Sequence, residues 1–174
     1  MDTLDEYVHG LRRSKGKGIP TFSNNDGRTK AKILFLLRDP GRSGASKTSE
    51  VDRGNPGSTA KNFREANDAA GLNRKLTISW NAVPWPVPDG STFAKELNKV
   101  REEGWLDKLL GLLPKLRVAV LLGDEAHELT PDLYESHREL HVLYGPHPSW
   151  SGVGTPVRRK WLDTTVRKAH DIVR

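Results

Sequence analysis

An apolar run at residues 33–37 ends abruptly in an Arg-Asp-Pro-Gly sequence at residues 38–41. A short apolar run closed by proline and glycine predicts a buried β-strand, here one that presents the Asp39 carboxylate at its C-terminal end. Two later stretches repeat this plan: residues 77–80 lead into Asn81, and residues 140–144 lead into a Gly-Pro-His-Pro-Ser sequence that contains His147. Ligands of open parallel α/β sheets bind outside the C-terminal ends of the strands. Asp39, Asn81 and His147 are therefore expected to form one site.

Helical patterns separate the predicted strands, so the chain is expected to be an α/β protein with a parallel sheet covered on both faces. Residues 1–30 are expected to form a basic N-terminal arm with a short helix at 4–11, and residues 31–174 a single domain. The strands are predicted at residues 32–38, 75–80, 117–123 and 138–144. The helices are predicted at residues 58–70, at 91–100 with Ser91 as the cap, at 105–113, at 124–130 and at 156–173.

The net charge of +6 at pH 7 favours polyanionic partners, because each phosphate that a protein neutralises releases counterions. The chain has no cysteine, which excludes disulfides, thiol nucleophiles and cysteine-bound zinc or iron–sulfur clusters. No apolar run reaches the length of a membrane span, and no apolar leader segment is evident. We expect a cytoplasmic monomer that does not associate with membranes.

Four motifs, taken in order, resemble those of the uracil-DNA glycosylase superfamily. They are the Arg-Asp-Pro-Gly sequence at residues 38–41, the Asn-Ala-Val sequence at 81–83, the Leu-Leu-Gly sequence at 121–123 and the His-Pro-Ser sequence at 147–149. The resemblance implies a three-layer α/β/α sandwich with a four-stranded parallel sheet. It also implies a monofunctional DNA glycosylase that hydrolyses the N-glycosidic bond of uracil or a related deaminated base during base excision repair. This chemistry requires no metal and no cofactor, and the partner is DNA that contains the damaged base.

The chemistry of this reaction assigns a role to each of the three strand-end residues. Breaking a deoxyribosyl–base bond places positive charge on the sugar and negative charge on the departing base. Asp39 suits the stabilisation of the sugar cation and the positioning of the attacking water. His147 suits the donation of a hydrogen bond to the base anion, and the amide of Asn81 can donate to a base oxygen and accept from the adjacent ring N–H.

Further residues are expected to hold the base and the DNA. Family members often carry an aromatic residue after the first motif, whereas this chain has none between Gly41 and Ala60. Trp85 is the expected substitute, because the helical spacing of Phe63 suggests a core position. The remaining expected base contacts are Pro40 and Gly41, and the expected DNA contacts are Arg42, Ser149, Trp150, Arg158, Arg159 and Lys160.

Two other functions stay open from the sequence. The missing aromatic favours a glycosylase-like module that binds nucleic acid without cleaving it. A small-molecule nucleoside or nucleotide hydrolase is the other alternative, and it predicts no length-dependent binding to DNA. A metal site at His137 and His141 is not expected, because their spacing does not converge at the approach to a strand.

Overall fold

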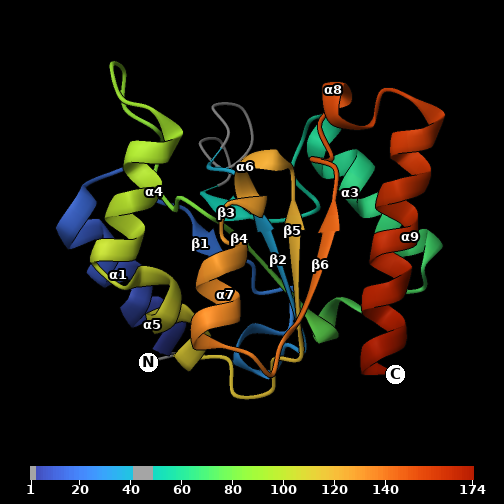
Figure 1. Cartoon of the computed structure of the whole chain (residues 1–174), viewed down its shortest axis with the longest axis horizontal. Coiled ribbons are helices and arrows are strands. Elements are labelled where there is room, and N and C mark those ends of the chain that lie inside the picture. Colours follow the sequence, from blue (N-terminus) through green and yellow to red (C-terminus); the bar gives the residue numbers. More distant parts are fainter. Residues whose placement is uncertain (1–2, 41–48) are drawn as a thin grey trace.

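The computed structural model describes residues 3–40 and 49–174, and four parallel strands form its main sheet in the order β4-β2-β5-β6. The register pairs Leu37 with Asn81 across β2 and β4, and Leu122 with Gly145 across β5 and β6. All four C-terminal strand ends therefore lie at one edge of the sheet (Figure 1). The strands are β2 (Ile33–Leu37), β4 (Thr77–Asn81), β5 (Val118–Leu122) and β6 (His141–Gly145).

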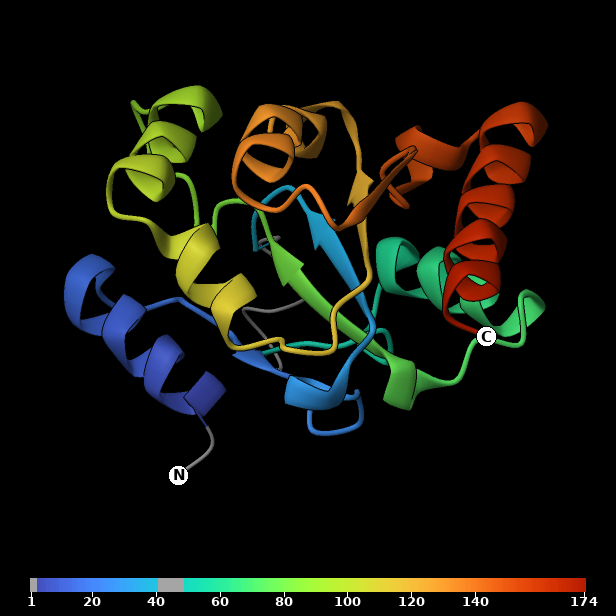
Figure 2. The same ribbon diagram turned by 60° about the horizontal axis from the view of Figure 1, so that its bottom comes forward.

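Helices cover both faces of this sheet, which confirms the three-layer α/β/α sandwich (Figures 1 and 2). One layer contains α1 (Thr3–Lys15), α4 (Phe93–Glu102), α5 (Trp105–Gly111) and α7 (Thr130–Ser136). The other contains α3 (Ser58–Ala69) and α9 (Pro156–Val173). Two short helices, α6 (Asp124–His127) and α8 (Trp150–Val153), follow β5 and β6. Two short strands, β1 (Thr21–Phe22) and β3 (Glu50–Val51), pair in parallel outside the main sheet, and 3₁₀ turns η1 (Arg28–Lys30) and η2 (Arg74–Leu76) precede β2 and β4.

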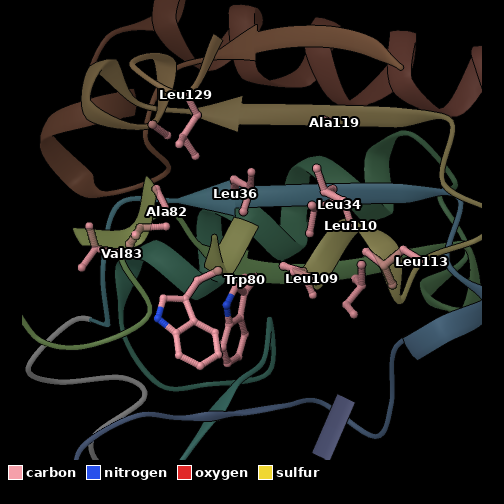
Figure 3. Close-up of a cluster of buried hydrophobic side chains, with 14 of the residues drawn as sticks. Leu34, Leu36, Trp80, Ala82, Val83, Leu109, Leu110, Leu113, Ala119 and Leu129 are labelled. Carbon is pink, nitrogen blue, oxygen red and sulfur yellow. The ribbon is translucent and has the colours of Figure 1, made fainter. Parts of the chain in front are cut away.

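The alternation of side chains along each strand divides the hydrophobic core in two, because successive residues point to opposite faces of a sheet. Leu34 and Leu36 of β2 belong to the core beneath α1, α4 and α5, where Trp80 also lies (Figure 3). Ile33 and Phe35 belong to the core beneath α3 and α9. The sheet is thus buried on both faces, which accounts for the nearly continuous apolar sequences of β2 and β5.

The N-terminal segment contributes to the main core, although the sequence led us to expect a basic arm there. The apolar face of α1 is buried, with Leu4 and Leu11 fully inaccessible to solvent. Tyr7 packs edge-on against the ring of Trp105, and Phe22 stacks on Trp80 with 3.8 Å between the ring centroids. Residues 3–22 therefore close one side of the sheet.

Two predicted boundaries shift for local reasons. Thr92, not Ser91, caps α4: its hydroxyl accepts from the N–H of Lys95, whereas the hydroxyl of Ser91 donates to Glu96 at 2.6 Å. The fourth strand begins at His141, because α7 continues to Ser136 and a turn follows it. Within residues 3–40 and 49–174, no helix is long and apolar enough to cross a bilayer.

Candidate functional site

The strand ends bring the three predicted residues to one cavity of about 200 Å³. Asp39 follows β2, Asn81 ends β4, and His147 follows β6; all three line the cavity. The chain runs from β2 to β4 on one side and then returns to β5 on the other side of β2. Sheets of this kind bind ligands where the strand order reverses, which is the edge at which Asp39 stands.

Asp39 lies in a largely buried environment, with 16% of its side chain exposed. Burial raises the pKa of its carboxyl group above the ordinary value, and Glu125 adds to the rise, whereas Arg38 and the backbone N–H of Val87 oppose it. Nη1 of Arg38 stands 3.3 Å from Oδ1 of Asp39, and its Nε stands 3.2 Å from Oε1 of Glu125. Asp39 thus places a largely buried carboxyl group with a raised pKa at the cavity.

His147 is held as a neutral imidazole with a defined tautomer. Its Nδ1 accepts a hydrogen bond from the backbone N–H of Ser149 at 3.2 Å, so the proton of the neutral ring resides on Nε2. Burial lowers the pKa of His147; Glu125 opposes this shift and Arg38 adds to it. Gly123 allows the ring to lie against the end of β5, because a Cβ at this position would stand 3.0 Å from Cβ of His147. The result is a neutral N–H donor at the cavity.

Asn81 is 5% exposed and its Nδ2 has no hydrogen-bond partner among the described residues. The β2–β4 ladder continues past it, since the N–H of Ala82 donates to the carbonyl of Leu37 and that of Val83 to the carbonyl of Arg38. These bonds fix the backbone on both sides of the site. A buried amide donor without a partner is costly, because it loses its hydrogen bonds to water. Asn81 is therefore a candidate contact for a ligand.

The loop that carries His147 is held from two sides. The side-chain amide of Asn62, on α3, donates to the carbonyl of Pro148 at 2.9 Å. The hydroxyl of Ser149 caps α8 by accepting from the N–H of Gly152. A Cβ at Gly152 would stand 1.8 Å from the carbonyl oxygen of His147, so only glycine allows α8 to turn this closely under the loop.

Two solved structures share this architecture. SMUG2 from Pedobacter heparinus matches over 97% of this chain and 82% of its own, with a TM-score of 0.61 and 13% sequence identity. A candidate uracil DNA glycosylase from Methanosarcina acetivorans matches over 86% of this chain and 99% of its own, with a TM-score of 0.52 and 17% identity. The chain has the uracil-DNA glycosylase fold. No family model matches it, and no curated protein matches it in sequence.

In this fold Trp85 does not occupy the position that we expected for it. Its side chain is 4% exposed in the core on the opposite face of the sheet, and its indole N–H donates to Glu96 at 2.8 Å. The prediction that Trp85 contacts the base is therefore not supported. Phe63, assigned from its spacing to the core, is indeed buried there but also lines the cavity. Pro40 lines the cavity too, whereas Gly41 and Arg42 lie outside the described residues.

Some of the predicted DNA contacts are exposed side chains, and one is bonded to other side chains of the protein. Trp150 is 73% exposed at the start of α8, immediately after the His-Pro-Ser sequence. Arg158 and Lys160 are exposed on α9. Arg159 is engaged instead: its guanidinium donates to Oδ1 of Asn62 at 2.9 Å and stands 3.4 Å from Glu65. Arg159 therefore braces the loop that carries His147, and its contact with DNA stays a prediction.

The sequence reasoning missed several side chains of the site. Arg38 and Glu125 flank Asp39 and His147 as described above, and neither was among the predicted site residues. Ser79 and Arg53 line the cavity. The signal for Ser79 was present: Thr77, Ser79 and Asn81 alternate with two apolar residues, which marks one polar face on a strand of a sheet that helices cover on both faces. No sequence pattern revealed Arg53, which stands in a loop.

Proposed function

We propose that this chain is a monofunctional DNA glycosylase that hydrolyses the N-glycosidic bond of uracil or a related deaminated base in DNA. One observation carries the proposal: a carboxyl group, a neutral imidazole N–H and a buried amide nitrogen without a partner among the described residues line the same cavity at the ends of three parallel strands. The likeness to solved glycosylase structures supports the fold on which this site stands. The likeness does not by itself assign the reaction.

The reaction begins when the bond between C1′ of the sugar and N1 of the base breaks and its electron pair moves to the base. The Asp39 carboxylate stabilises the positive charge that develops on the sugar. Nε2–H of His147 donates to the base oxygen on which negative charge collects. A water molecule then adds to C1′, and its proton passes to Asp39 as general base. Side chains of this chain supply each of these groups.

Base selection is assigned to Asn81. Its Nδ2 donates to a carbonyl oxygen of the base, and its Oδ1 accepts from the neighbouring ring N–H. Uracil offers this pair of groups, whereas cytosine presents an amino donor and a ring acceptor at the same atoms. An amide whose orientation is fixed would therefore reject cytosine, because both hydrogen bonds would become contacts between like groups.

The base must leave the duplex before it can enter the cavity, at a cost of a few kcal/mol. We propose that Trp150 occupies the space left in the base stack, because its ring is 73% exposed beside the His-Pro-Ser sequence.

Trp150→Ala is expected to lower excision from double-stranded DNA roughly ten-fold or more, because a stacked base is worth ~1–3 kcal/mol. Excision from single-stranded DNA should be less affected. Single-turnover rates on matched single- and double-stranded uracil substrates test this. Tyr134→Ala, which removes an exposed ring from α7, is the control; equal losses on both substrates would contradict the role.

The pH dependence of the reaction should follow Asp39. The carboxylate form is the active one, so activity is lost as the pH falls through the pKa of Asp39. Because that pKa is raised by burial, the loss should begin at a higher pH than for an ordinary aspartate. His147 has a lowered pKa and stays neutral at pH 7. A pH profile of single-turnover rates checks this, and Asp39→Asn should show a slow rate without this acidic limb. A parent profile that is flat down to the ordinary pKa of aspartate would contradict it.

The decisive assay uses labelled single- and double-stranded oligonucleotides that contain one uracil, followed by alkali to cut abasic sites. Cleavage by the parent that disappears in His147→Ala and Asp39→Ala proteins, purified identically, would support the proposal and exclude a contaminating glycosylase. No cleavage of uracil or of other deaminated bases by a folded parent would overturn it. Binding without cleavage would favour the module that binds nucleic acid. One observation also favours that module: among the described cavity-lining residues, Phe63 is the only phenylalanine, tyrosine or tryptophan, and it is 3% exposed.

A further inference from the structure

One wall of the cavity is formed by a polar face of β4 that would otherwise be core. Thr77, Ser79 and Asn81 are 0%, 3% and 5% exposed, and they alternate along the strand, so their side chains share the face that α3 covers. Ser79 and Asn81 line the cavity, and Thr77 lies deeper on the same face. The hydroxyl of Ser79 and Nδ2 of Asn81 have no partner among the described residues.

Arg53 brings a cation to this wall. It is 3% exposed, lines the cavity, and donates from Nη2 to the hydroxyl of Thr77. Its guanidinium carbon stands 5.7 Å from the centroid of the Phe63 ring, which lines the same cavity. Nε and Nη1 have no hydrogen-bond partner among residues 3–40 and 49–174. Burying a cation with unmade hydrogen bonds is strongly unfavourable, so these two donors require an explanation.

The neighbouring carboxylates do not supply the missing partners. Arg74 engages both of them, Asp52 at 2.7 Å and Asp26 at 2.9 Å. Asp52 also accepts from the hydroxyl of Ser23 and the backbone N–H of Gly54. The two acids balance the charge of Arg74 by direct contact and that of Arg53 at longer range, yet they leave Nε and Nη1 of Arg53 without a bond. The positive charges of Arg53 and Arg74 are thus compensated. Nε and Nη1 of Arg53 remain able to donate to a group that enters the cavity.

We propose that Arg53 is a second electrostatic catalyst of this site, which stabilises the negative charge of the departing base together with His147. The inference rests on the proposed function. When the bond between C1′ and N1 breaks, its electron pair spreads over the base, and Arg53 donates from Nε and Nη1 to the acceptor atoms that gain this charge. Arg53 keeps its proton throughout; the only proton that moves is that of the water, which passes to Asp39. A fixed cation in a cavity that excludes water is effective because it does not have to reorganise.

Arg53→Met is the direct test, because it keeps the length of the side chain and removes charge and donors. Its single-turnover rate on uracil is expected to fall roughly ten- to one hundred-fold, the range for hydrogen bonds to a charged group. The loss should be smaller for 5-fluorouracil, whose anion is intrinsically more stable and needs less help. This leaving-group dependence is the decisive readout, because a purely structural role would slow both bases equally.

Two further variants separate catalysis from folding. Arg64 donates to the backbone carbonyl of Arg53 at 3.0 Å, so Arg64→Met disturbs the loop without touching the guanidinium; it should slow both bases to the same extent. Arg53→Lys keeps the charge and should retain the parent's ratio of rates for the two bases. Arg53→Gln, which removes the charge, replaces Arg53→Met if that protein fails the thermal-unfolding check and should shift the ratio in the same direction. Equal losses on both bases in Arg53→Met, or a shifted ratio in Arg64→Met, would overturn the inference. No excision by the parent would instead count against the proposed function itself.

Discussion

Replacing His147 by alanine is expected to lower the single-turnover rate of uracil release by roughly 10²- to 10³-fold, the usual effect of removing one preorganised donor to a developing anion. The ring is positioned for this role by the N–H of Ser149 on Nδ1, which leaves the proton on Nε2. DNA binding should change much less than the rate, because the interaction strengthens only as the base acquires charge. Rates and affinities measured on the same oligonucleotide distinguish the two effects.

His141→Ala is the matched control for this experiment, because His141 is an exposed histidine at the opposite end of the same strand, β6. It should behave like the parent. A His147→Ala protein that binds DNA more weakly but releases base at the parental rate under saturating conditions would contradict the leaving-group role. Rescue of the rate by His147→Gln, which returns a neutral N–H donor, would be further support.

Asp39→Asn is expected to lower the rate by roughly 10²- to 10⁴-fold, the contribution typical of a positioned general base. The amide keeps the shape of the side chain, but it carries no negative charge for the sugar cation and takes no proton from water. DNA binding should be retained or slightly strengthened, because the substitution removes a negative charge near the phosphates. Single-turnover cleavage and binding to an uncleaved substrate analogue measure the two quantities.

The control for Asp39→Asn is Asp171→Asn, which makes the same chemical change near the C-terminal end of α9, far along the chain from the strand-end motifs. Parental activity in the Asp39→Asn protein would remove Asp39 from the mechanism. A rate that falls in step with stability, measured by thermal unfolding, would instead indicate that the ion pair of Arg38 with Asp39 has a structural role.

The sequence by itself determined that the sheet is parallel and that three polar residues stand at its strand ends. An apolar run five residues long has room for one strand, and a parallel strand must end at the same edge as its neighbours. Asp39, Asn81 and His147 each stand at or within three residues of the end of a predicted strand, so their convergence required only the strand direction. The final helix at residues 156–173 was equally well marked, since Pro156 fixes its first turn and its apolar positions recur at helical spacing.

Only the tertiary structure decided which of the remaining polar and aromatic residues face the cavity. Trp85 and Phe63 are both buried rings, and the choice between them depends on which face of the sheet each one covers. Arg159 and Arg158 are neighbours on one helix, yet only Arg159 reaches Asn62 and is engaged there. Arg53 stands in a loop without periodicity, and its position beside Thr77 results from packing between segments 24 residues apart. Such pairings depend on distances through space, which local sequence patterns do not encode.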